Sequence, residues 1–210
     1  MEAAAAPGRF GLNYALLTVS PDEILTLVEQ SYRAYFEAEP ARASVSFLGV
    51  EPMEVLRFES PLGQDEIVNY VSLGMARRPM TGGDELVVAE DGPRAELLLQ
   101  CRGDGGDLWR QLAILASAPV VEGLIFSAGA RVDLGTPLAS GSRCTGAIVS
   151  VAELARLEFS GGGVEFLRLL PATANELAWA RIHGSEALAE RWNLQGVDLL
   201  DLGRESVQLD

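Results

Sequence analysis

The sequence predicts an α+β domain whose sheet is mixed or mostly antiparallel. The expected elements follow the order helix, many strands, helix, strands, helices, which is typical of this class. A second observation is the apolar run at residues 67–73, which lacks a strict alternation of apolar and polar residues. A strand of this kind is covered on both faces, so we place it centrally in the sheet and expect helices over it.

The first predicted helix covers residues 21–36. Ser20 is a good N-cap, Pro21 suits the first helical position, and Glu23 completes a capping box with Ser20. An apolar stripe at helical spacing is expected to face the core. Its members are Ile24, Leu25, Leu27, Val28, Tyr32, Tyr35 and Phe36.

Short strands follow this helix. Runs rich in valine, phenylalanine and leucine are separated by turn residues, for example by glycines 82 and 83. These runs predict strands near residues 44–50, 53–59, 66–74, 85–89 and 94–101.

The second half of the chain alternates again between helix and strand. A helix is expected to begin at residues 106–107 and to end or bend at Pro119. The apolar segments 123–134 and 144–151 predict two strands, and glycines 161–163 predict a flexible turn into a strand at 164–170 that Pro171 closes. Thr173 and Glu176 form a second capping box, and residues 185–192 predict a further helix after Gly184.

The bulk composition indicates one globular domain. The chain has 210 residues, of which 48% are hydrophobic, enough for a sizeable core. We expect a single domain at 20–202, an N-terminal tail and lead-in at 1–19, and a C-terminal tail at 203–210. The chain shows neither a secretory signal nor a membrane-spanning run, so we expect a cytoplasmic protein.

The net charge of −14 argues against binding to nucleic acid or to an anionic membrane, because both would repel the surface on average. Two interpretations of this charge remain. It could attract a basic protein partner, or it could serve solubility alone.

The two cysteines, Cys101 and Cys144, lie among small or apolar residues of predicted strands. We expect reduced, buried thiols. The alternative is a disulfide, which requires the two strands to be neighbours with suitable Cα spacing.

Motifs for catalysis are missing from the sequence. It contains no nucleotide fingerprint, phosphate loop, nucleophile elbow or zinc-protease motif. The single histidine, His183, is expected to interact with a helix C-terminus, although pairing with Cys101 or Cys144 in a thiol mechanism is an alternative. Acidic clusters such as 104–107 and 198–201 fit turns and caps better than metal sites. We predict no catalytic residue, no cofactor and no metal.

A basic spot follows the predicted central strand. Arg77, Arg78 and Met80 are the candidate partner-binding residues, since arginine is enriched among interface hot spots. The alternative is that both arginines pair with nearby carboxylates such as Asp84 and Glu85.

Several segments, taken in order, resemble bacterial Suppressor of fused domain proteins. The segments are residues 70–80, 94–99, 108–116, 166–171, 176–177 and 183–188, and the resemblance extends over residues 20–202. It implies a curved mixed sheet flanked by helices, and a protein that binds other proteins without catalysis. Bacterial members are expected to act as immunity proteins, so the sharpest form of this hypothesis is an antitoxin that masks a basic toxin.

The sequence leaves two other hypotheses open. One is an enzyme with a dispersed site of carboxylates, arginines and a cysteine. The other is a small-molecule or peptide sensor whose cleft is lined by Tyr32, Tyr35, Phe36 and Trp109.

Overall fold

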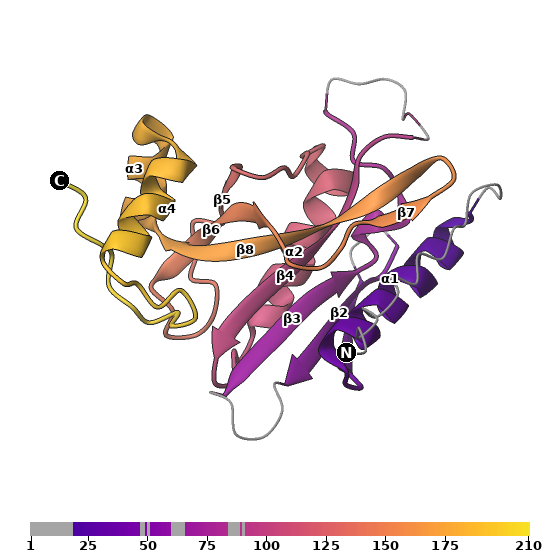
Figure 1. The fold of residues 1–210 in the computed structure, drawn as a ribbon, viewed down its shortest axis with the longest axis horizontal. Coiled ribbons are helices and arrows are strands. Elements are labelled where there is room, and N and C mark those ends of the chain that lie inside the picture. The colour runs from indigo at the N-terminus through magenta and orange to yellow at the C-terminus, as the bar shows by residue number, and fades with distance from the viewer. Residues whose placement is uncertain (1–18, 47–48, 50, 60–65, 84–88, 90) are drawn as a thin grey trace, which may run out of the picture.

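The computed structural model describes residues 19–46, 49, 51–59, 66–83, 89 and 91–210. Their strands form one open sheet in the order β1-β2-β3-β4-β8-β6-β5, with β7 paired to β8 (Figure 1). The strands are β1 (Ala41–Val45), β2 (Met53–Glu59), β3 (Ile67–Leu73), β4 (Arg94–Arg102), β5 (Arg131–Asp133), β6 (Cys144–Val151), β7 (Leu157–Phe159) and β8 (Gly162–Thr173). Only the pair β4 and β8 is parallel among them. The mixed, mostly antiparallel sheet is therefore confirmed.

Helices cover both faces of this sheet. α1 (Pro21–Phe36) packs on one face and α2 (Leu108–Glu122) on the other, while α3 (Ala174–His183) and α4 (Ser185–Leu194) stand at the far end from α1 (Figure 1). A short 3₁₀ helix, η1 (Met75–Arg77), follows β3. Six of the seven residues of β3 are buried, as expected for a central strand.

α1 begins as the sequence predicts. The backbone N–H of Glu23 donates to Ser20 Oγ, and the N–H of Ser20 donates back to the Glu23 carboxylate. The apolar stripe is narrower than predicted, because Ile24, Val28 and Tyr32 are buried whereas Tyr35 is 44% exposed. Successive residues turn by about 100° around a helix, which brings Tyr35 to the edge of the stripe.

Of the two predicted effects of Pro119, that it ends or bends its helix, the first is wrong. α2 continues to Glu122 and is capped by Gly123, whose φ of 66° lies in the left-handed region. A Cβ at Gly123 would lie 2.7 Å from the backbone of Gly83, so close packing as well as the cap requires glycine here. The glycine cap and this close packing, rather than the proline, decide where α2 stops.

Several strand boundaries also differ from the predictions. β1 lies at Ala41–Val45 rather than at 44–50, and only Arg131–Asp133 of the segment 123–134 forms a strand. Pro171 does not close β8, which continues to Thr173. The pairing of β4 with β8 ends at Leu169, so the edge of β8 that faces β4 has no partner at Pro171. A proline is tolerated at such an edge, because its missing N–H is not needed there. β7 was not predicted, and glycines 162 and 163 belong to β8 rather than to the predicted turn. Most of the strand predicted at 85–89 lies outside the described residues.

The C-terminal segment packs on α3 and α4. Thr173 and Glu176 form the predicted capping box, and the Glu176 carboxylate also pairs with Arg204 at 2.7 Å. Val207 joins the apolar cluster of these helices. Residues 204–207 thus contact the body of the protein, whereas the division into a domain at 20–202 and two tails stays a prediction.

Both cysteines are reduced and buried, as expected. β8 lies between β4, which holds Cys101, and β6, which holds Cys144. Strands one place removed from each other are about 10 Å apart, beyond the Cα spacing of a disulfide. The condition for the disulfide alternative is therefore not met.

Candidate functional site

A hollow of about 430 Å³ lies beside the C-terminal end of α2. α2 packs against β1, β2, β3 and β4, and the hollow opens over the neighbouring strand β8. Because alternate residues of a strand share one face, Gly163, Glu165 and Leu167 all point to this side. The hollow is thus a part of the sheet face beyond the cover of α2.

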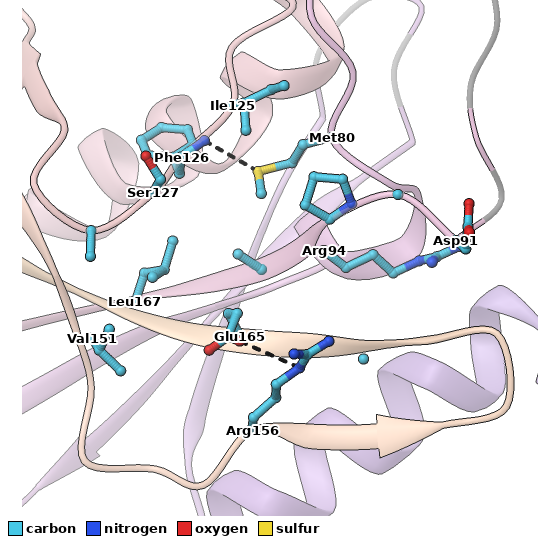
Figure 2. A pocket seen from close by; sticks show the side chains of 15 residues that line it. Met80, Asp91, Arg94, Ile125, Phe126, Ser127, Val151, Arg156, Glu165 and Leu167 are labelled. Atoms are coloured by element: carbon cyan, nitrogen blue, oxygen red, sulfur yellow. Dashed lines mark hydrogen bonds and ion pairs between the residues drawn. The ribbon is translucent and has the colours of Figure 1, made fainter. Parts of the chain in front are cut away.

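The floor of this main hollow is apolar. Met80, Ala95, Phe126 and Leu167 line it, and each is at most 5% exposed. Met80 is held by its backbone N–H, which donates to Pro93 O at 2.7 Å, and its Sδ accepts from the N–H of Phe126 at 3.4 Å. Figure 2 shows Met80, Ile125 and Phe126 on one side of the hollow and Arg156 and Glu165 on the opposite side.

Charged side chains line the opposite wall and the end. The Arg156 guanidinium lies 3.2 Å from Glu158 and 3.4 Å from Glu165, and Arg94 lies over the Phe159 ring at 5.8 Å. A Cβ at Gly163 would come within 2.8 Å of Arg156 Nε. Glycine at this position therefore lets Arg156 lie across β8.

Exposed apolar side chains lie on the segments that border the hollow. Nine large apolar residues of the described chain are exposed, and five of them lie at the C-terminal end of α2, just after it, or at the end of β6. We call these five, Val120, Val121, Leu124, Ile125 and Val151, the apolar rim. Two of them, Ile125 and Val151, line the main hollow directly. An apolar cluster of this kind is typical of a binding surface.

A smaller hollow of about 80 Å³ holds the two predicted arginines. Arg77 and Arg78 each lie 3.5 Å from Glu51, so they pair with this carboxylate; of the predicted acids, Asp84 and Glu85, the structure describes neither. Val120 of the apolar rim lines the same hollow. Met80, the third predicted residue, is only 4% exposed and forms the floor of the main hollow instead. The three residues thus border two hollows, and their role in binding stays a prediction.

A buried carboxylate orders the turn that carries the arginines. Glu96 of β4 is fully buried and accepts from the Ser72 hydroxyl and from the backbone N–H groups of Gly74 and Ala76 at the start of η1. Burial raises the pKa of Glu96, and these hydrogen bonds offset only part of the effect. The prediction missed this residue, although a glutamate inside the apolar run 94–101 was a signal for it.

The described geometry does not favour a thiol mechanism. Cys101 and Cys144 are both fully buried, and burial raises the pKa of each thiol to about 11. His183 is exposed at the end of α3, where its ring stacks on Trp179 at 4.1 Å. A surface imidazole and two buried, protonated thiols do not make an activated nucleophile.

The acidic clusters behave as turn residues. Asp104 and Asp201 accept from the backbone N–H groups of Gly106 and Gly203, and Asp198 pairs with Arg102 at 2.9 Å. Among the residues that the structure describes, no three His, Cys, Asp or Glu side chains are grouped so as to hold a metal ion.

The aromatic residues proposed for a sensor do not share a cleft. Tyr32 and Phe36 belong to the core on the α1 face, with Phe36 stacked on Phe58, whereas Trp109 packs on the α2 face. The sheet separates the two groups, which removes the basis of that hypothesis.

Comparison with known proteins identifies the family. The family model described as "Suppressor of fused protein (SUFU)" matches residues 49–205. The chain belongs to the Suppressor of fused family. The expected resemblance is thereby confirmed for this part of the chain. No protein of curated function matches it.

Solved structures of Suppressor of fused proteins share the fold. A structure described as a homologue from Neisseria gonorrhoeae FA 1090 has a TM-score of 0.67 and 20% identity, covering 88% of this chain and 97% of that one. The structure of the Sufu–Fu complex has a TM-score of 0.64 and 12% identity, and the match covers 87% of this chain and 91% of that one. The structure of Drosophila Suppressor of Fused has a TM-score of 0.64 and 13% identity, and the match covers 88% of this chain but 50% of that one. Within the described part of this Suppressor of fused chain, no helix has the length and apolar character to cross a membrane.

Proposed function

We propose that this protein is a non-enzymatic binding domain whose partner is a basic protein. The observation that carries the proposal is the apolar rim around the main hollow. Exposed apolar side chains on the segments that border the hollow, two of them beside its apolar floor, form the kind of surface that contacts a protein partner. The Sufu–Fu complex supports it, because a protein of the same fold is there bound to another protein.

Charge supports the choice of a basic partner. The net charge of −14 attracts cationic surfaces over distances longer than direct contacts and speeds their association. The sharpest form of the proposal is a cytoplasmic immunity protein that masks a basic toxin. That form rests on the charge and on the role expected of bacterial family members.

The test is affinity capture from the native organism with the tagged protein, followed by mass spectrometry. We expect one stoichiometric basic protein. Replacing Ile125 and Val151 of the rim by glutamate should weaken its binding at least about tenfold, as for hot-spot residues. Matched control substitutions are Ile182→Glu and Leu194→Glu, because these apolar side chains are 80% and 86% exposed away from the rim.

The outcomes separate the alternatives. Retention of the partner by the rim variants, or equal loss with the controls, would exclude the rim as the binding surface. A neutral or acidic partner would contradict the charge argument. If the partner is a toxin, co-expression with the wild-type protein should restore growth, and co-expression with the rim variant should not.

A further inference from the structure

We infer that the main hollow binds one apolar side chain of the size of leucine, methionine or phenylalanine, presented by a partner segment whose neighbouring residues are lysine or arginine. The inference rests on the proposed function and adds the chemical class of the segment that is recognised.

The shape and chemistry of the floor indicate the apolar side chain. Met80, Ala95, Phe126 and Leu167 are held in place by the core, and Ile125 and Val151 extend the apolar surface to the rim. A side chain that enters the hollow therefore exchanges water for carbon and sulfur contacts on several sides. A volume of about 430 Å³ admits one large apolar side chain with part of its backbone.

The floor is formed before any partner arrives. The Met80 and Phe126 contact at 3.4 Å joins the segment after η1 to the segment after α2. The latter is tied to β6 by bonds from Gly129 N–H to Val149 O and from Val149 N–H to Ala130 O, both 2.8 Å. A pocket that needs no rearrangement binds its ligand at a lower entropic cost.

The charges at the hollow indicate basic neighbours for the apolar side chain. The acidic residues that line it or pair with its lining are Asp91, Glu158 and Glu165, and the basic ones are Arg94 and Arg156, a surplus of one carboxylate in a chain whose net charge is −14. Arg156 is already engaged by Glu158 and Glu165, and Arg94 by the Phe159 ring. Cationic residues on both sides of the apolar anchor complement this surplus, whereas acidic residues would be repelled.

The inference can be tested with pools of eleven-residue fluorescent peptides. One pool has leucine at the centre and arginine at the two positions on each side, with the outer positions randomised. A second pool replaces the central leucine by serine, and a third replaces the arginines by glutamate. Fluorescence anisotropy should show binding of the first pool, at least about tenfold weaker binding of the second, and none of the third.

A substitution that fills the hollow shows whether the peptides bind there. Ala128 is exposed and lines the hollow, so Ala128→Trp places a large ring in it without disturbing the core. This variant should lose the leucine-centred pool, while Ile182→Trp, on α3, should bind like the wild type. Thermal unfolding of both variants checks that they are folded.

The inference and the proposed function can fail separately. Equal binding of the leucine and serine pools, no binding of any pool, or unchanged binding by Ala128→Trp overturns the inference. Capture of a basic partner that Ala128→Trp retains but Ile125→Glu loses also overturns it, and leaves the proposed function standing. Leucine-selective peptide binding with no captured partner supports the inference and counts against the proposed function.

Discussion

Glu96 is a carboxylate buried at the edge of the binding region. It is fully buried, and hydrogen bonds from Ser72, Gly74 and Ala76 couple it to the start of η1. The pKa of a buried carboxyl rises because the charged form loses its hydration, and the pKa of Glu96 lies above the ordinary value of a glutamate. The turn that leads to Arg77 and Arg78 is therefore built around a group that resists ionisation.

This pKa predicts a pH dependence of stability. Because the folded pKa exceeds the unfolded value, Glu96 stabilises the fold fully below about pH 4.5, and this contribution is lost as the pH rises through the folded pKa. The difference in free energy of unfolding between the wild type and Glu96→Gln should therefore decrease from pH 4 upward. Urea unfolding measures it, with the exposed Glu190→Gln as control. A difference that grows with pH would contradict the raised pKa.

The thiols provide a second prediction at this scale. Cys101 and Cys144 are fully buried and have pKa values raised to about 11 by burial. At pH 8 the thiols of the native protein should therefore react with a reagent such as Ellman's reagent no faster than the protein unfolds around them. In denaturant both thiols should react at once. Rapid reaction of either thiol in the native state would contradict its burial.

At the scale of elements, the C-terminal segment is held on α3 and α4 by one buried ion pair. Glu176 is fully buried and Arg204 nearly so, and the Arg204 guanidinium also donates to Pro171 O at 2.8 Å. Burial opposes ionisation of Glu176, but hydrogen bonds from Arg204 and from the N–H groups of Thr173 and Val207 outweigh it. The pKa of Glu176 therefore lies below its ordinary value.

Removal of one partner leaves the other charge buried and unpaired. Arg204→Ala should lower the free energy of unfolding by about 3–5 kcal/mol at pH 7. The matched control is Arg143→Ala, whose pair with Glu205 is exposed and should cost about 0–1 kcal/mol. Because the folded pKa of Glu176 is lowered, its contribution is present above pH 4.5 and lost as the pH falls. Equal effects of the two substitutions in urea unfolding would refute the structural role of the pair.

At the scale of the whole molecule, the charge determines how a partner would approach. A surface with a net charge of −14 should accelerate association with a basic partner at low salt. Raising the salt concentration from 50 to 500 mM should lower the association rate constant at least about tenfold and change the dissociation rate constant much less. Stopped-flow mixing with the captured partner measures both rates. Association that does not depend on salt would contradict electrostatic attraction.

The sequence by itself determined those features that depend on neighbouring residues. Ser20, Pro21 and Glu23 define the start of α1, and Thr173 and Glu176 that of α3, because a capping box needs only residues three positions apart. The run of β3, which lacks a strict alternation of apolar and polar residues, likewise identified a central strand. For the candidate site, the sequence drew attention to Arg77, Arg78 and Met80 but not to the hollow.

Only the tertiary structure decided the rest. Phe126 and Met80 are 46 residues apart and meet at the floor of the hollow, and the parallel pairing of β8 with β4 brings Glu165 and Leu167 to the same place. The same pairing ends at Leu169 and lets β8 run through Pro171, against the local signal. Local signals specify helix ends and turns, whereas a hollow arises from segments that become neighbours only when the sheet is assembled.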